Sequence, residues 1–425
     1  MKKQISLFFL MMMICGFVFA NNHQPIINKK NNPNPKNAGL KLPAGFSATK
    51  LVEGYGTARH IAVTPQGTIF YKSNKPYQGK TIFQIVKNKN GVDTVLGFGN
   101  YTGTGMAVKN GYLYASSDEE VFRYKLNDKG EVENVDAPEK IITGLVNNHE
   151  HEAKAIMLDN DGNIYVNIGA YSNACQEQDR QLHSPGIKPC PILNEAGGIW
   201  KFKVDKLNQS YADGIRYATG LRNVVGFDWN TQTNTLFVMQ HGRDQLHDNW
   251  PEYFDEKSSA EIPAECMYEL HENDNCGWPY IYFDLNQNKK MIAPEYGGDG
   301  KKFTTDYSNP VISFPAHLAP NALLFYTGNQ FPEKYKNGAF IAFHGSWNRA
   351  PLPQQGYYVV FVPFKDGKPT GKWEVFADGF TGKNQILSTR EAVRRPCGLA
   401  QDADGNLYIT DDVKGAVYKI TYNNK

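Results

Sequence analysis

A short segment with two histidines, His149-Glu150-His151-Glu152, combines residue types that could carry chemistry. If the segment is a strand, the two imidazoles share a face, because side chains two positions apart point the same way. They could then bind a metal ion, with the neighbouring carboxylates as further ligands. Alternatively, one imidazole is a general base, since its unperturbed pKa of about 6.5 allows it to accept a proton near neutral pH. A polar loop with partly exposed histidines explains the same spacing without chemistry.

Basic side chains recur at one kind of position along the chain. Arg59, His151, Arg222 with Asn223, and Arg395 each lie eight to twelve residues before a turn that runs into a short apolar strand. The Arg222 guanidinium offers a planar fork to a carboxylate, and the Asn223 amide adds a neutral donor. A structural ion pair is the alternative for Arg222. If these positions converge, a ring of Arg and His predicts an anionic ligand.

A loop with a glycine and two carboxylates follows one of these strands. It reads His241-Gly242-Arg243-Asp244, with Asp248 shortly after. Backbone carbonyls and carboxylates are suitable ligands for a hard cation such as calcium. The EF-hand spacing is absent, and Asp244 could equally cap a turn.

A second histidine-containing segment, His344-Gly345-Ser346-Trp347-Asn348-Arg349, closes another strand and adds Arg349 and Asn348 at its end. A serine between a histidine and a tryptophan suggests nucleophilic catalysis, but no Gly-x-Ser-x-Gly elbow is present, which argues against hydrolase chemistry. His317 precedes a further strand and could face the same channel, or lie on the surface near prolines.

The elements that must position these residues are short strands, each entered through a turn rich in Gly, Asn or Asp. A turn that needs positive φ, followed by alternating β-formers, indicates the start of a strand. The repetition predicts an all-β fold, a six-bladed β-propeller whose axial channel holds a ligand. The six copies are QGTIFY from Gln66, NGYLYA from Asn110, DGNIYV from Asp161, TNTLFV from Thr233, NGAFIA from Asn337 and DGNLYI from Asp404.

The spacing of the six copies is uneven, and the surplus residues indicate long loops at 170–196 and 241–306. Long ordered loops on one face of a rigid scaffold commonly carry binding residues, so we expect them on the active-site face. Helical periodicity is nearly absent. One short helix is expected around 249–256.

The two ends of the sequence predict export. Residues 1–20 have two lysines, an apolar run and a final Ala20, as in a secretory signal peptide. Residues 21–39 are rich in Asn, Pro and Lys and are expected to be a disordered linker, with the propeller domain at 40–425. No retained membrane span is expected, and we predict a periplasmic or secreted protein. Without Lys2 and Lys3, basic and acidic residues balance, which gives no support for nucleic-acid binding.

Five cysteines follow the expected cleavage site, and an oxidising compartment favours disulfides among them. Sequence proximity favours pairing Cys175 with Cys190 and Cys266 with Cys276, although other arrangements are open. Cys397 would then be free and buried.

Several long motifs together resemble the soluble quinoprotein sugar dehydrogenases, the glucose and sorbosone dehydrogenase family, most closely the sorbosone-type branch. The resemblance covers nearly everything from about Gly45 onwards. The motifs are GLRNVVGFDW from Gly220, HGRDQL from His241, GWPY from Gly277, PEYGGDGK from Pro294, FIAFHGSWNR from Phe340, GYYVVFVPFKDGKPTG from Gly356 and RPCGLA from Arg395.

The resemblance implies a propeller that holds pyrroloquinoline quinone and calcium (Ca2+) at the mouth of its axial channel. The family's catalytic histidine matches His151, with His149 as the rival, and its cofactor clamp matches Arg222 and Asn223. Its calcium loop implies backbone carbonyl ligands at Gly242 and Arg243. The remaining cofactor positions are expected at Lys154, Arg349, Arg59, His317 and Arg395, of which Arg59, His317 and Arg395 rest mainly on the ring of basic residues. Where glucose-oxidising members have an acidic residue, this chain reads Gly169-Ala170-Tyr171, which argues against glucose itself.

The implied activity is oxidation of a sugar or sugar-derived aldehyde by hydride transfer to the quinone, with a histidine as general base. No Cys-x-x-Cys-His motif for covalent haem is present, so electrons are expected to pass to an external cytochrome or quinone. A calcium-dependent propeller lactonase or other hydrolase is one alternative, and a non-catalytic glycan-binding propeller is the other.

Overall fold

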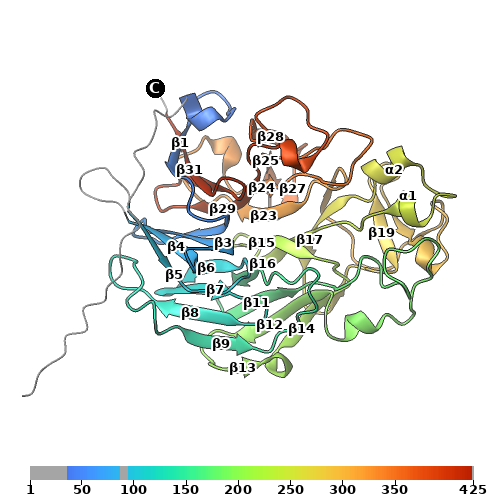
Figure 1. Ribbon diagram of the computed structural model, residues 1–425, viewed down its shortest axis with the longest axis horizontal. Helices are drawn as coiled ribbons and strands as arrows, with labels where there is room; N and C mark the ends of the chain where they lie inside the picture. The colour runs from blue at the N-terminus through green and yellow to red at the C-terminus, as the bar shows by residue number, and fades with distance from the viewer. Residues whose placement is uncertain (1–35, 87–93, 424–425) are drawn as a thin grey trace, which may run out of the picture.

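All six turn-and-strand copies form β-strands in the computed structural model, which describes residues 36–86 and 94–423 (Figure 1). The turns before them contain residues with positive φ, such as Gly67, Gly162 and Gly405. The prediction of an all-β protein is confirmed, since strands dominate the described chain. The six strands are β3 (Ile69–Tyr77), β7 (Tyr112–Ser116), β11 (Asn163–Ile168), β16 (Thr235–Gln240), β24 (Ala339–Phe343) and β30 (Leu407–Asp411).

Each of these strands is the second strand of an antiparallel sheet of four main strands. The first three sheets are β2 (Ala58–Val63), β3, β4 (Lys80–Val86) and β5 (Thr94–Phe98); β6 (Met106–Lys109), β7, β8 (Val121–Lys125) and β9 (Glu139–Thr143); and β10 (Ile156–Leu158), β11, β12 (Gly198–Lys203) and β14 (Ile215–Thr219). The next three are β15 (Val224–Asn230), β16, β17 (Glu265–Leu270) and β22 (Ile312–Phe314); β23 (Pro320–Phe325), β24, β25 (Tyr358–Val362) and β28 (Glu374–Ala377); and β29 (Pro396–Gln401), β30, β31 (Ala416–Tyr422) and β1 (Phe46–Val52). Short parallel strands extend two sheets, β13 (Gln209–Ser210) beside β9 and β18 (Asp274–Asn275) beside β14.

The first strands of the six sheets contact one another in sequence order, and β29 returns to contact β2. An interior cavity of about 310 Å3 is lined by residues from all six of these strands. The sheets therefore surround a common axis, as in a propeller.

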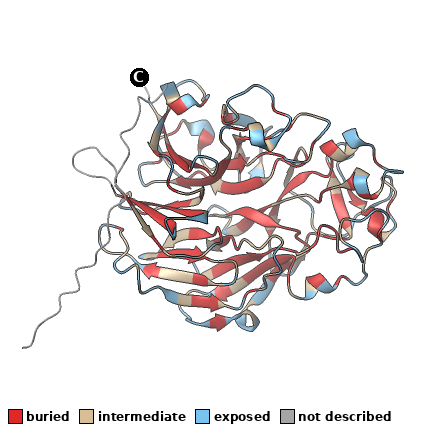
Figure 2. Ribbon diagram, viewed as in Figure 1, coloured by how far each residue is buried: buried red, intermediate tan, exposed pale blue. Residues whose placement is uncertain are grey.

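The last sheet is completed by the beginning of the described chain. Strand β1 pairs antiparallel with β31, with Phe46 opposite Tyr422. Figure 1 shows this blue strand beside the red C-terminal one. Between the fifth and sixth sheets, Phe46 packs edge-to-face on Phe331 and Phe376. Burying one such ring contributes about 1.5–3 kcal/mol, so this interface helps to hold the two sheets together. Figure 2 shows the same burial along the strands of the other sheets.

The connection between β16 and β17 is long and carries α1 (Leu246–Asn249) and α2 (Glu256–Glu261), the α-helices of the described residues. The single helix expected at 249–256 is therefore wrong in its bounds. Asp255 accepts a hydrogen bond from the Ser258 backbone and begins a new helix at Glu256, because a side-chain acceptor at this position satisfies an otherwise unpaired N–H. The next connection, between β17 and β22, contains β19 (Ile281–Asp284), β20 (Lys289–Ile292) and β21 (Phe303–Thr304), which form a small sheet.

The remaining elements are short. Strands β26 (Phe364–Lys365) and β27 (Lys368–Pro369) form a two-residue hairpin ladder. The 3-10 turns are η1 (Lys36–Gly39), η2 (Pro191–Asn194), η3 (Tyr211–Asp213), η4 (Pro294–Tyr296), η5 (Glu333–Tyr335) and η6 (Thr389–Glu391).

One of the two expected disulfides is present. Cys175 and Cys190 are bonded, whereas Cys266 and Cys276 are free and buried, so the second pairing is wrong. Burial raises the pKa of both free thiols. A thiol that stays protonated is a poor nucleophile for disulfide formation. Cys397 is free and buried, as expected.

The expected signal peptide at 1–20 and most of the expected linker at 21–39 lie outside the described residues. Of that linker, 36–39 form η1, with Ala38 buried. Within the described parts of the chain, every helix is too short or too polar to cross a membrane.

Candidate active site

A cavity of about 260 Å3 lies at one end of the first strands, where several loops meet. These loops precede β10, β15 and β23 or follow β16 and β24, and they bring together residues far apart in the sequence. The lining consists of His151, Arg180, Arg222, Asn223, His241, Gly242, Asp244, Glu265, His317, Ala319, Trp347 and Asn348.

His151 lies in the loop before β10, with its side chain 15% exposed. Its Nδ1 is 2.5 Å from the carbonyl oxygen of Ala170. Because a carbonyl oxygen can only accept, Nδ1 carries the proton, which leaves the lone pair on Nε2. Burial and the nearby charge of Arg222 lower the pKa of His151 to about 3, so the ring is neutral at neutral pH. The cavity is thus lined by a neutral imidazole whose Nε2 can accept a proton.

The other histidine of the segment, His149, has a different environment. Its side chain is 88% exposed, and Nδ1 lies 3.6 Å from a carboxylate oxygen of Glu152. Among the described residues, His149 is not part of the cavity lining. The two histidines that the sequence could not distinguish therefore lie in different surroundings.

Gly169 allows the His151 loop to approach the end of β11. A Cβ atom at this position would lie 2.6 Å from Cβ of His151 and 2.7 Å from its carbonyl oxygen. It would also lie 3.1 Å from Oδ1 of Asn223. Such contacts are far below van der Waals separation, so only glycine fits here.

Arg222 is buried, and two of its three nitrogens are paired. Nη2 donates to Oδ2 of Asp244 at 2.8 Å, and Nη1 donates to the Gly242 carbonyl at 3.0 Å. Nε is buried without a hydrogen-bond partner among the described residues, and so is Oδ1 of Asn348. Buried polar atoms are normally paired, so an orphaned donor and an orphaned acceptor at one cavity indicate a site for a polar ligand.

Asp244 connects most of the polar groups of the cavity. Besides Arg222, its carboxylate accepts from Nδ2 of Asn348 at 2.7 Å and lies 3.6 Å from Nδ1 of His317. Burial opposes its ionisation, but the charges of Arg222, His317 and Arg180 outweigh burial and lower its pKa. Asp244 is therefore a buried anion.

Glu265, at the start of β17, is the second buried carboxyl group of the lining. Its oxygens accept from the backbone N–H groups of Gly242 at 2.9 Å and Ala319 at 3.2 Å. Burial raises its pKa to about 8. Glu265 thus links the loop that contains Gly242 to the loop that contains Ala319.

Of the sequence-predicted site residues, His151, Arg222, Asn223, Gly242 and His317 line this cavity. His317 also contacts the Ser259 carbonyl through Nε2 at 2.9 Å.

The side chains of three basic residues predicted for the site bind protein groups outside the cavity lining. Lys154 donates to the carbonyl of Glu152 at 2.5 Å. Arg349 donates to the carbonyls of Ala260 and Pro353. The side chain of Arg243 pairs with Glu295 at 2.6 Å. Within the described chain, none of these three residues belongs to the cavity lining.

Arg59 and Arg395 lie together in a second cluster. Arg59 donates to Asp412 at 2.8 Å, and the same carboxylate lies 2.9 Å from Nε2 of His344. Arg395 donates to the backbone carbonyls of His344 at 3.0 Å and Gly345 at 2.8 Å. The predicted ring of basic residues is thus divided between the cavity and this cluster.

Sequence analysis assigned no site role to Arg180, Glu265, Ala319 and Trp347, which also line the cavity. Asn348 was noted beside Arg349 at the end of a strand, and the structure places Asn348 in the lining. Arg180 lies in a long loop with no periodicity, and Glu265 begins an ordinary strand; neither carried a local signal.

Comparison with known proteins places these observations in a family. A family model described as TrAA12-like matches residues 40–423. An uncharacterized protein of Borreliella burgdorferi is 26% identical over 402 residues, covering 90% of this chain and 91% of that protein. A pyrroloquinoline quinone-dependent pyranose dehydrogenase of Coprinopsis cinerea is 26% identical over 330 residues, covering 66% of this chain. The alignment spans only 40% of the length of that dehydrogenase.

The fold is also similar to that of a solved structure. The solved holo form of the pyrroloquinoline quinone domain of pyranose dehydrogenase from Coprinopsis cinerea superposes with a TM-score of 0.69 at 20% identity. The superposition covers 90% of this chain and 97% of that domain.

Proposed function

Since the chain belongs to the TrAA12-like family, we propose that it is a dehydrogenase that oxidises a sugar or sugar-derived aldehyde with pyrroloquinoline quinone as cofactor. The observation that carries this proposal is the pairing, in one cavity, of a neutral His151 with the buried, partly unpaired guanidinium of Arg222. The named relative is a pyranose dehydrogenase, so pyranoses are the first substrates to test. Sorbosone-like aldehydes, suggested by the sequence motifs, come next.

In this proposal the six sheets form a six-bladed β-propeller with the site at the mouth of the axial channel. The closed cycle of first strands supports this arrangement.

The residues present fit the quinone. Nε of Arg222 is a buried donor with no hydrogen-bond partner in the described parts of the chain, which suits an anionic, oxygen-rich ligand. We assign Arg222 and Asn223 to hold it in the cavity, with His317 beside them. Arg59 and Arg395 would add positive charge from the second cluster. Lys154 and Arg349 stay weaker assignments, because both are engaged with backbone carbonyls.

The residues also fit calcium. We propose the carbonyl oxygens of Gly242 and Arg243 as ligands and add the carboxylate of Asp244. The Gly242 carbonyl accepts one hydrogen bond from Arg222 and keeps a second lone pair. Oδ1 of Asn348 is a buried acceptor that none of the described residues pairs with, and it is a further oxygen of the kind that calcium prefers.

When bound, the quinone supplies a two-electron acceptor for hydride, and calcium supplies positive charge beside it. The chain supplies the proton chemistry and the orientation. The Ala170 carbonyl holds Nδ1–H of His151, so Nε2 is the atom that takes the proton from a substrate hydroxyl. Arg222, fixed by Asp244 and Gly242, keeps its positive charge in place without reorganisation, which stabilises negative charge that develops in the cavity.

The test compares His151→Ala with His149→Ala in protein loaded with quinone and calcium. Reduction of a dye by a panel of pyranoses and aldehydes measures turnover. General-base catalysis contributes about 10²–10⁴ in rate, so His151→Ala should lose that factor. His149→Ala should keep the wild-type rate, because its side chain is outside the cavity. Absorbance titration with the quinone should give similar affinity for both variants.

Other outcomes separate the rival functions. Lactone hydrolysis with calcium and without quinone would identify a hydrolase. Sugar binding without dye reduction in the loaded protein would identify a glycan-binding protein. Full turnover by His151→Ala would remove that residue from the base role.

The proposed reaction needs an electron acceptor outside this chain. Electrons leave to an external acceptor, a cytochrome or a quinone. The protein acts in the periplasm or outside the cell, as the signal-like residues 1–20 suggest.

A further inference from the structure

Arg180 enters the cavity from the long loop at 170–196, which was expected on the active-site face, although no role was predicted for Arg180 itself. Nη2 donates to Oε1 of Glu150 at 2.7 Å, and Nη1 donates to Oε1 of Gln245 at 2.8 Å. Nη1 also lies 3.4 Å from Oδ2 of Asp244, and Nε lies 3.5 Å from Asp179. All three nitrogens of the guanidinium therefore already contact protein groups.

We infer that Arg180 is a positioning residue that holds the His151 loop in place against the Gly242–Asp244 loop. This inference rests on the proposed role of His151 as the base. Arg180 contacts Glu150, the residue next to His151, and Asp244, which pairs with Arg222 and is a proposed calcium ligand. It acts through them and not on the substrate.

The His151 loop needs such support because its backbone is strained. His149 and His151 have φ values of 62° and 50°, in the left-handed region that non-glycine residues rarely adopt. Such a residue persists only where surrounding contacts fix its backbone. Glu150 lies between them, and its ion pair with Arg180 holds this part of the loop in addition to the hydrogen bond between His151 Nδ1 and the Ala170 carbonyl.

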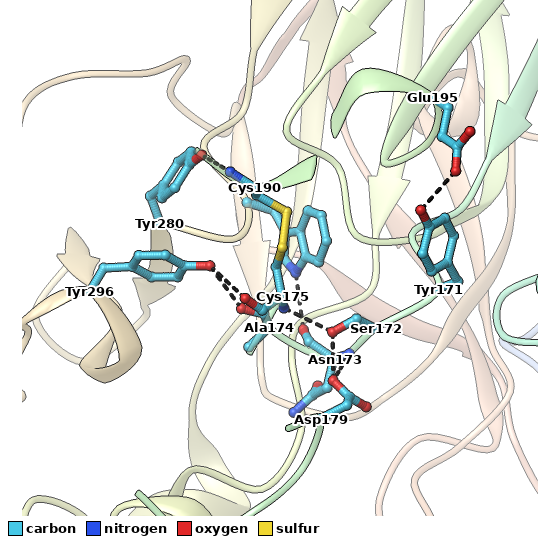
Figure 3. The surroundings of a disulfide bond; sticks show 11 residues. Tyr171, Ser172, Asn173, Ala174, Cys175, Asp179, Cys190, Glu195, Tyr280 and Tyr296 are labelled. Carbon is cyan, nitrogen blue, oxygen red and sulfur yellow. Dashed lines mark hydrogen bonds between the residues drawn. A yellow bond between two sulfur atoms is a disulfide. The ribbon is translucent and has the colours of Figure 1, made fainter. Parts of the chain in front are cut away.

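The loop that carries Arg180 is itself firmly fixed (Figure 3). The Cys175–Cys190 disulfide closes it, and both cysteines are buried. Oδ1 of Asp179 accepts from the Ser172 hydroxyl at 2.5 Å and from the Asn173 backbone at 3.0 Å. Figure 3 shows these bonds beside the disulfide.

The same loop is attached to the metal-binding side of the cavity. Asn173 donates to the carbonyl of Asp244 at 2.9 Å and accepts from the Asp244 backbone N–H at 2.9 Å. The disulfide loop and the Asp244 loop thus form one unit, from which Arg180 extends to Glu150.

The test uses Arg180→Ala, with Arg123→Ala as the matched control. Arg123 forms a comparable ion pair with Glu139 at 2.5 Å, outside the cavity lining. Loss of Arg180 should lower kcat by about 10- to 100-fold with little change in KM, since a displacement of about 1 Å at a catalytic group costs up to about 10² in rate. Arg123→Ala should leave kcat unchanged.

Two measurements separate positioning from other roles. Hydrogen exchange of the protein without quinone should become faster in segment 147–154 in Arg180→Ala and not in Arg123→Ala. The double variant Arg180→Ala/Glu150→Ala should be no slower than Arg180→Ala alone, because residues that act as one unit are not additive.

Unchanged kcat, unchanged exchange in 147–154, or a rise in KM alone would overturn the inference; the last result would mean that Arg180 binds substrate. If the wild-type protein oxidises no sugar, the proposed function fails. The exchange experiment still decides whether Arg180 holds the loop.

Discussion

Replacing Gly169 with alanine tests whether the position of His151 controls turnover. The substitution adds a single methyl group, outside the cavity lining, at a residue whose φ is not in the left-handed region. Backbone strain therefore does not contribute, and any effect comes from the methyl group's contacts.

The size of the effect follows from those contacts. The new Cβ would lie 2.6 Å from Cβ and 2.7 Å from the carbonyl oxygen of His151. Carbon contacts are normally about 3.5–4.0 Å, so the His151 loop must move by about 1 Å. The carbonyl belongs to the backbone, so a side-chain rotation cannot relieve the clash. A shift of about 1 Å at a catalytic group lowers the rate by about 10²-fold, and overpacking destabilises by about 1–3 kcal/mol.

The assay measures kcat by dye reduction per mole of bound quinone, together with the melting temperature. Normalising to bound quinone removes any contribution from unfolded protein. Gly371→Ala is a suitable control, because its new Cβ would meet only the Pro363 side chain at 3.2 Å, and neither residue lines the cavity. A Gly169→Ala protein with kcat within twofold of wild type would refute the link between this close approach and catalysis.

Two further predictions concern stability. Removing the disulfide with Cys175→Ser/Cys190→Ser opens a loop with a sequence separation of 15 and should lower the free energy of unfolding by about 3 kcal/mol in urea denaturation; an unchanged midpoint would contradict this. The pKa of His60 is lowered to about 4, chiefly by burial, so below about pH 6.5 the unfolded chain binds a proton that the folded chain does not. The free energy of unfolding therefore falls as the pH drops from about 6.5 towards about 4, by up to about 1.4 kcal/mol per pH unit for this group. His60→Gln keeps a donor for the Asn321 carbonyl, and its free energy of unfolding should fall less over that pH range. Equal pH dependence of the free energy of unfolding in both proteins would show that His60 does not contribute.

The strands could be predicted because their signal is local. A turn with positive φ and two to four alternating β-formers specify each of the six second strands without help from the rest of the chain. The convergence of His151, Arg222 and His317 could be predicted in the same way. Each residue precedes the first strand of a sheet, and these first strands surround one axis.

The rest of the site depends on contacts between distant segments. Arg180 reaches the cavity because a disulfide and Asn173 fix its loop against Asp244, some 70 residues later. Arg349 stands in a motif that matched a cofactor position, yet its guanidinium donates to the Ala260 and Pro353 carbonyls. No periodic sequence pattern predicts the path of the Arg180 loop or the direction of the Arg349 guanidinium.

The pairing of β1 with β31 has a consequence for how the molecule is made. Phe46 and Tyr422 lie opposite each other, so the outer edge of the last sheet stays unpaired until nearly the whole chain has been synthesised. Five sheets can form in order from neighbouring segments, whereas the sixth requires ends that are separated by almost the full length of the sequence. Such a non-local contact is slow to form, and the open ring exposes a strand edge to aggregation meanwhile.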